Sequence, residues 1–290
     1  MLILVGVFAL LVNTGQLSAD RVFELVNLWP VILIVIGLEL IVRRSVHGPA
    51  GDLAAAVIVL LAVVGAAVYV TVTPVPATTG TLDASSEVGG VTEASAEIDA
   101  GAATVTVAAG ADLGANLYHA HIEYAGPKPE VRLDPSGRLK IDQPNNGFLT
   151  FQNRRFALNL DLNPSIPWRI TLNSGATTST INVPHLHLTG LTLNTGASRN
   201  EITLGSASGI VPVTVNGGSL TVHVHRPSGT NASVQVSGGA VSLDADGKSM
   251  HSIGNVNYET SGFSGAADGY RLRVNGGSCT VTLDTATESA

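Results

Sequence analysis

The chain is poor in charged, aromatic and sulfur-containing residues. Only 13% of its 290 residues are charged, the net charge is −7, and lysine occurs only at positions 128, 140 and 248. Such a chain does not attract polyanions, which argues against a nucleic-acid partner. The single cysteine, Cys279, excludes an internal disulfide, and its place in the pattern described below predicts a core residue. Aromatic residues make up 4% of the chain, which leaves few stacking platforms for sugars.

Motifs that fix a catalytic geometry are also missing. The sequence contains no G-x-S-x-G, H-E-x-x-H or C-x-x-C. We therefore expect neither enzymatic activity nor a cofactor. A polysaccharide-acting β-helix enzyme is the alternative from another functional class, and it would need acids, bases and aromatic residues gathered in one groove.

Long apolar runs occur only near the amino terminus. Residues 28–42 and 53–72 are apolar, and Arg43 and Arg44 lie in the short loop between them. Residues 1–13 are apolar too, but short for a bilayer, which asks for about 20 residues. We predict a membrane anchor of three apolar helices in residues 1–72.

The two arginines predict the orientation of the chain. Short cytoplasmic loops carry an excess of arginine and lysine, so Arg43 and Arg44 mark the cytoplasmic side. With three spans, everything after residue 72 lies outside the cytoplasmic membrane. Residues 73–90, rich in Pro, Gly, Thr and Ser, read as a flexible linker. Residues 91–290 then form an extracytoplasmic domain.

That outer domain repeats one short pattern, in which an apolar residue and a polar step precede a glycine and an alternating segment. The glycines that mark the copies are Gly101, Gly175, Gly196, Gly218, Gly239 and Gly277. From the second to the fifth, the spacing is 21, 22 and 21 residues, and the last gap is 38. A fixed period of this length predicts a β-solenoid, whereas the alternative β-sandwich gives turn signals at about 8–12 residues.

The alternation predicts which side chains face the core. Counted from Gly101, Gly218, Gly239 and Gly277, even offsets are apolar and odd offsets are mostly polar, whereas the Gly175 and Gly196 copies become apolar only at offsets 6 and 8. Val222 and Val281 should therefore be buried, while His223 and Thr282 should be exposed. The Asn-Gly and Gly-Gly steps at the markers read as tight turns with positive φ. We expect the copies to stack in the order of the sequence.

Two stretches carry a family resemblance. GVFALLVNTGQL and LWPVILIVIGLELIVRR, at residues 6–17 and 28–44, resemble the hydrophobic anchor module of bacterial cell-envelope stress proteins of the LiaI/LiaF type. Residues 166–204 and 270–283 are similar to the toast-rack β-domain of the same proteins. The resemblance implies a non-enzymatic, membrane-tethered sensor or scaffold, and it carries no catalytic residues onto this sequence. The predicted outward topology differs from that of members whose β-domain is cytoplasmic.

Three H-x-H pairs are the candidates for chemistry. They are His119/His121, His185/His187 and His223/His225. Residues i and i+2 of a strand point to the same side, so a pair can offer two imidazoles to one metal ion.

The third pair has acidic residues at matching offsets in neighbouring copies. If the copies stack in sequence order, Glu201, His223, His225, Asp244 and Asp246 form one exposed patch. Histidine and carboxylate ligands suit zinc or another divalent ion, so this patch is the candidate metal site. The alternative is a solvated polar face that discourages edge pairing.

Taken together, these patterns predict N-terminal transmembrane helices followed by an all-β repeat domain, a toast-rack-like β-solenoid. We expect a multi-pass protein of the cytoplasmic membrane that senses or scaffolds at the cell envelope, in stress or adhesion. Its partners would be the membrane and another membrane or envelope protein. Self-assembly into a β-scaffold is a further alternative, which leaves a homo-oligomer open.

Overall fold

The computed structural model describes residues 79–111, 113–144 and 155–285, and these form an all-β domain. The predicted membrane helices of residues 1–72 lie outside the described residues. Within the described ranges, the structure contains no helix with the length and apolarity needed to cross a membrane. The strands are β1 (Thr79–Glu87), β2 (Ala94–Ala109), β3 (Asn116–Ala125), β4 (Glu130–Leu133), β5 (Arg138–Asp142), β6 (Arg155–Leu162), β7 (Trp168–Val183), β8 (Leu188–Leu204), β9 (Ile210–Asn216), β10 (Ser219–Arg226), β11 (Ala232–Ala245), β12 (Lys248–Glu259) and β13 (Gly269–Thr285).

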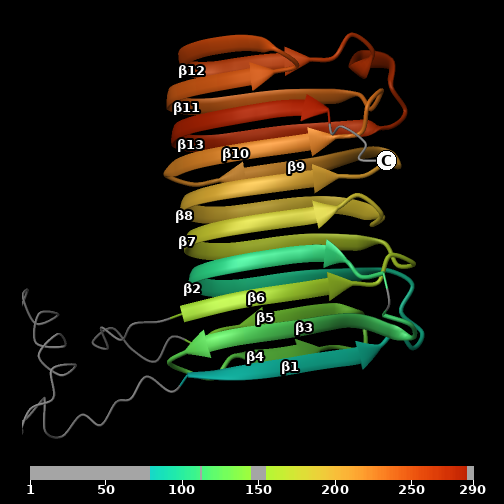
Figure 1. The fold of residues 1–290 in the computed structure, drawn as a ribbon. Helices are drawn as coiled ribbons and strands as arrows, with labels where there is room; N and C mark the ends of the chain where they lie inside the picture. Colours follow the sequence, from blue (N-terminus) through green and yellow to red (C-terminus); the bar gives the residue numbers. More distant parts are fainter. Residues whose placement is uncertain (1–78, 112, 145–154, 286–290) are drawn as a thin grey trace, which may run out of the picture. The chain divides into compact units, whose positions relative to one another are not determined.

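The strands pair side by side into one stack (Figure 1), in the order β1-β3-β6-β2-β7-β8-β10-β13-β11-β12. From β6 to β11 every pair on this path is parallel. Strands β7 and β8 pair 21 residues apart, and β8 and β10 pair 22 residues apart, which are the spacings of the sequence repeat. An antiparallel β-sandwich is therefore wrong for this domain.

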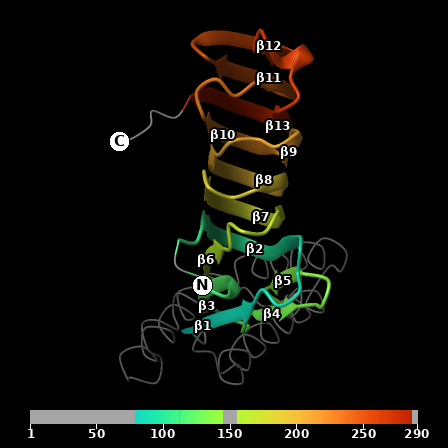
Figure 2. The ribbon, with the colours of Figure 1, turned by 90° about the vertical axis from the view of Figure 1, so that its right-hand side faces the viewer.

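Each long strand contributes to two layers. The first half of β13 pairs with β9 and its second half with β10, while β2 divides in the same way between β5 and β6. Figure 2 shows β6 and β10 on one side of the stack and β5 and β9 on the other. Apolar side chains from both halves fill the space between the layers, which places one continuous core inside the stack.

The predicted register is confirmed. Val222 is fully buried and Val281 is 1% exposed, whereas His223 and Thr282 are half-exposed. Cys279 is a free thiol buried in the same core. Alternation with period 2 therefore sorts the side chains as the sequence predicts.

The marker glycines are not turns, so that prediction was wrong. Gly175 and Gly196 lie within β7 and β8, and none of the six markers has a positive φ. What they lack is room for a side chain. From Gly175 onward, a Cβ atom on each marker would lie only 2.3–3.0 Å from the carbonyl oxygen of the marker on the preceding strand of the stack. The six glycines thus form a column, the glycine column, in which each long strand bends against its neighbour.

A row of asparagines runs beside this column, two residues before four of the six markers, and Asp99 holds the same place before Gly101. The Nδ2 of Asn173 donates to Asp99 over 2.7 Å, and Asn194, Asn216 and Asn275 each donate to the preceding asparagine over 2.9 Å. Lys140 closes the row with an ion pair of 2.8 Å to Asp99. We call this row the asparagine ladder. The ladder provides hydrogen-bond partners for side-chain amides along five strands. Each of these hydrogen bonds adds a net stabilisation of about 1 kcal/mol.

The two ends of the stack depart from the prediction. Thr79–Glu87, assigned to the linker of residues 73–90, is strand β1 and pairs with β3. Its Thr- and Ser-rich sequence alternates, and Leu82 and Ala84 pack partly against the core, so composition alone misplaced the boundary. At the other end, β12 runs antiparallel to β11, and β13 returns to lie between β10 and β11. The copies therefore do not stack in sequence order.

Candidate functional site

A group of four titratable side chains lies on the outer face of three neighbouring strands. β10 carries His223 and His225, and it lies between β8, which carries Glu201, and β13, which carries Asp284. The parallel register pairs His223 with Glu201 and His225 with Asp284. All four side chains stand at odd offsets from their marker glycines and therefore point away from the core.

His225 contacts an acid on each side. Its Nε2 lies 2.6 Å from Oε1 of Glu201, and its Nδ1 is in hydrogen-bond contact with Oδ1 of Asp284. His223 lies farther away, with Nδ1 3.5 Å from Oε2 of Glu201. Since both ring nitrogens of His225 face carboxylates, both can donate only when the imidazole is protonated.

The pKa of His225 follows from this geometry. Burial alone would lower the pKa, but the hydrogen bonds to Glu201 and Asp284 outweigh it and raise the pKa above 6.5. The positive form therefore ties β8, β10 and β13 together across their outer face. The arrangement is an ion-pair clamp whose strength depends on pH.

The predicted metal patch is only partly assembled. Glu201, His223 and His225 come together, but Asp244 and Asp246 do not join them, because β13 lies between β10 and β11. Asp244 faces Thr282 and accepts a hydrogen bond from Ser249 instead. Sequence order gave the wrong neighbour for β10, and the acid that takes its place is Asp284.

In the part of the chain that the structure describes, no set of three or more His, Cys, Asp or Glu side chains has the arrangement of a metal site. The hydrogen bonds of His225 occupy both of its nitrogens, and a metal ion would have to replace at least one of them. Zinc binding at Glu201, His223 and His225 stays a prediction.

The other two histidine pairs differ from each other. His121 on β3 lies with its Nδ1 2.6 Å from Oδ1 of Asp83 on β1, and His119 lies 3.9 Å from both Asp83 and Asp161. The hydrogen bond to Asp83 raises the pKa of His121. This pair thus repeats the His-acid arrangement of β10 near the other end of the stack. His185 and His187 lie in the turn between β7 and β8, not on a strand.

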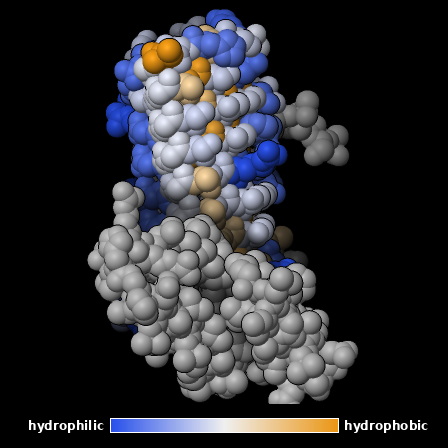
Figure 3. All heavy atoms as spheres, turned by 90° about the vertical axis from the view of Figure 1, so that its left-hand side faces the viewer, coloured by the Kyte–Doolittle hydropathy of each residue, from blue (hydrophilic) through white to orange (hydrophobic). Residues whose placement is uncertain are grey.

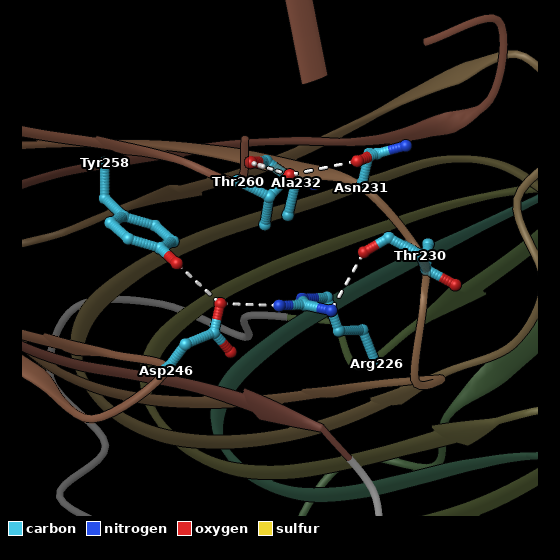
Figure 4. A network of polar contacts seen from close by, with 7 residues as sticks. All are labelled: Arg226, Thr230, Asn231, Ala232, Asp246, Tyr258 and Thr260. Atoms are coloured by element: carbon cyan, nitrogen blue, oxygen red, sulfur yellow. Dashed lines mark hydrogen bonds and ion pairs between the residues drawn. The ribbon is translucent and has the colours of Figure 1, made fainter. Parts of the chain in front are cut away.

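A second polar group locks the β11–β12 hairpin (Figure 4). Arg226, which is 5% exposed, forms an ion pair of 2.6 Å with Asp246 and donates to the carbonyl oxygen of Thr230 over 2.8 Å. Tyr258 of β12 donates to the same carboxylate over 2.7 Å. Asp246 and Gly247 both have positive φ, as a tight two-residue hairpin turn requires. The group connects the end of β10 to the turn between β11 and β12 and to β12 itself.

Two open hollows lie beside the glycine column. One is lined by residues of β2, β6, β7 and β8 that include Thr178 and Arg199, and the other by residues of β11, β12 and β13 that include His251 and Ile253. Neither lining contains a carboxylate. A polysaccharide-acting site of paired acids therefore does not form in either hollow.

Sequence reasoning missed a buried polar group inside the stack. The Oγ of Ser179 donates to Oδ1 of Asn200 over 2.8 Å, and Nδ2 of Asn200 donates to Ser198 over 2.9 Å. Ser179 and Asn200 are each 1% exposed. Their even offsets from Gly175 and Gly196 were the available signal, because even offsets face inward whatever the residue type.

With this geometry in place, comparison with known proteins identifies the family. The N-terminal domain of toast_rack, DUF2154, matches residues 75–225, and the LiaF transmembrane domain matches residues 1–77. The chain belongs to the toast_rack family. Its LiaF transmembrane domain implies that this toast_rack protein is anchored in a membrane. No curated protein matches the chain.

One solved structure shows the same fold, and another gives a weaker match. A candidate cell adhesion protein from Clostridium sporogenes shares 18% identity with a TM-score of 0.57, and the match covers 72% of this chain and 100% of that one. A candidate adhesin from Bacteroides fragilis covers 72% of this chain and 97% of its own, at 12% identity and a TM-score of 0.29. At this identity the Clostridium protein supports the toast_rack β-fold alone.

Proposed function

We propose that this toast_rack protein is a non-enzymatic sensor or scaffold of the cell envelope. Its β-solenoid would lie outside the cytoplasmic membrane on an anchor of three helices, and its partner would be another membrane or envelope protein. The observation that carries the proposal is the direct succession of the two family matches, 1–77 and 75–225, along one chain.

The described surface supports a binding role over a catalytic one. Outward side chains along the stack are mainly Thr, Ser, Asn and His, and the two hollows are open and lack carboxylates. Flat faces of regularly spaced polar side chains suit contact with another macromolecule. The clamp at His225 would add sensitivity to pH on such a face.

Adhesion is the second candidate function, because a protein described as a candidate for that role shares the fold. The two functions differ in where the partner lies. A sensor or scaffold contacts a protein of its own membrane, whereas an adhesin contacts an external surface.

Crosslinking in living cells tests the proposal. The full chain should capture a specific membrane or envelope protein, and a variant lacking residues 1–72 should lose it. Protease added to spheroplasts should remove the β-domain, because the proposed topology, with Arg43 and Arg44 on the cytoplasmic side, has the domain outside. A β-domain that resists protease until the membrane is opened would refute the topology. Capture of soluble enzymes of sugar metabolism alone would refute the sensory role.

A further inference from the structure

Strand β12 leaves one of its edges free at the end of the stack. It pairs with β11 on one side, and no described strand pairs with its other side. Figures 1 and 2 show it as the last strand of the domain, at the end opposite β1. A free edge presents unpaired N–H and C=O groups and invites another strand.

This edge carries little of the protection that free edges usually have. Lys248 and Glu259 stand at its two ends, and the ten residues between them contain no proline and only one titratable imidazole, His251. In its middle lies Ile253, which is 88% exposed and is the large hydrophobic side chain left open in the described residues. Figure 3 shows a hydrophobic patch at this end of a mostly polar face. We therefore asked what could cover the edge.

A head-to-tail partner does not fit. β12 crosses both layers, because it pairs with both halves of β11 on either side of a bend at Gly254, whose φ is 106°. At the opposite end, the two layers finish on different strands, β1 and β4. No single bent strand is available there to match β12.

A second copy of β12 does fit. Two copies that meet by the same edge are related by a twofold axis, which makes the pairing antiparallel. Bends stack on bends throughout the domain, as Gly254 does on Gly238. The two Gly254 residues must then face each other, which sets the register.

The register fixed by the bend also keeps the core continuous from one copy to the other. It pairs each residue of β12 with a residue an even number of positions away, so inward side chains meet inward ones. Met250 lies opposite Tyr258 of the partner subunit, and both are only half-buried in the single chain. Outside, Ile253 meets the partner's Asn255 and His251 meets the partner's Asn257. No like charges face each other. Pairing Gly254 with the partner's Gly254 thus also brings inward side chains opposite inward ones.

From the free edge, the exposed Ile253 and the bend at Gly254 we propose that β12 pairs antiparallel with β12 of a second copy, forming a twofold dimer centred on Gly254. The dimer joins two stacks end to end into one continuous pair of layers. The twofold axis is perpendicular to the length of the stack, so the two copies of Thr79 on β1 lie at opposite ends of the double stack but at the same position along the axis. Two copies anchored in one membrane can therefore form this dimer when the axis is perpendicular to the membrane. The inference does not depend on the sensory role.

A pair of charge variants tests the register on the full chain in detergent. In His251→Glu/Asn257→Glu, like charges oppose each other twice across the interface, so the mass measured by light scattering should fall by half. In the control His251→Glu/Asn257→Lys, opposite charges meet instead, and the dimer should persist. Within the chain these positions lie directly opposite Ser242 and Gln235, so neither variant places like charges directly opposite each other in the monomer.

Cysteine crosslinking supplies a second, independent measurement in membranes. Ile253→Cys/Asn255→Cys should give a covalent dimer under mild oxidation, because these positions face each other across the axis. Thr81→Cys/Asp83→Cys on β1, at the other end of the stack, should not. A monomeric wild-type chain at micromolar concentration, or a dimer that both charge variants retain equally, would overturn the proposal.

Discussion

Replacing Gly196 by alanine would drive a methyl group into the backbone of the neighbouring strand. A Cβ atom at this position would lie 2.3 Å from the carbonyl oxygen of Gly175. Gly101 provides the matched control, because it occupies the same place in the repeat, is equally exposed, and has nothing within 4 Å of its own Cβ position. The two substitutions change the same residue type in the same column and differ only in the space available.

The loss of stability expected for Gly196→Ala follows from the lack of space between the two strands. Carbon–oxygen contacts in sheets begin near 3.3 Å, so β7 and β8 would have to separate by about 1 Å around the new methyl group. Strain of this kind in a packed structure costs about 1–3 kcal/mol. Gly101→Ala meets no obstacle and restricts the unfolded chain, so we expect it to be neutral or to stabilise by up to about 1 kcal/mol.

Urea unfolding of residues 77–290 measures the difference. Trp168 is fully buried and is the single tryptophan of that fragment, so its fluorescence reports the loss of the core. Gly196→Ala should lower the midpoint without changing the slope, and Gly101→Ala should not lower it. Equal midpoints for the two variants would refute the role assigned to the glycine column.

Three further predictions use the same unfolding assay. Val281→Asp places an unpaired charge in the core and should cost about 3–5 kcal/mol, whereas its exposed neighbour Thr280→Asp should cost less than about 0.5 kcal/mol. Asn194→Ala interrupts the asparagine ladder and should lower the free energy of unfolding by about 1–2 kcal/mol, whereas Asn194→Ser should lose less stability. A raised pKa of His225 in the folded state means that the clamp stabilises fully below pH 6.5 and that this stabilisation is lost as the pH rises through the folded pKa. His225→Gln should therefore lose more stability at pH 5.5 than at pH 8.5.

Period and alternation predicted much of the β-domain. A spacing of 21–22 residues predicted parallel pairing between β7, β8 and β10, and the even offsets predicted buried residues such as Val222 and Val281. These signals succeed because each strand packs mainly against its neighbours, so local pattern and long-range structure agree. The marker glycines were misread because positive φ and close approach both require glycine, and only coordinates distinguish the two.

The order of the last strands was the larger error, and it decided the candidate site. Asp246–Gly247 between two alternating segments is the strongest short hairpin signal, and it shows that β12 reverses direction. With this hairpin, β11 of the Gly239 copy has β12 on one side, and β13 of the Gly277 copy pairs with its other side, next to β10. Asp284 would then have replaced Asp244 and Asp246 beside His225. Contacts between strands 59 residues apart leave no trace in a local pattern.

The position of β13 bears on how the domain can be made. Synthesis delivers β10 and β11 long before the strand that separates them, since β13 ends at Thr285. Earlier rungs such as β7 and β8 can assemble in order as the chain emerges, but the last part of the stack has to wait for the final residues. A chain cut short before Gly269 would leave β11 without its parallel neighbour and β9 and β10 with an open edge. The last strands can therefore complete their pairing only after translation has reached the end of this domain.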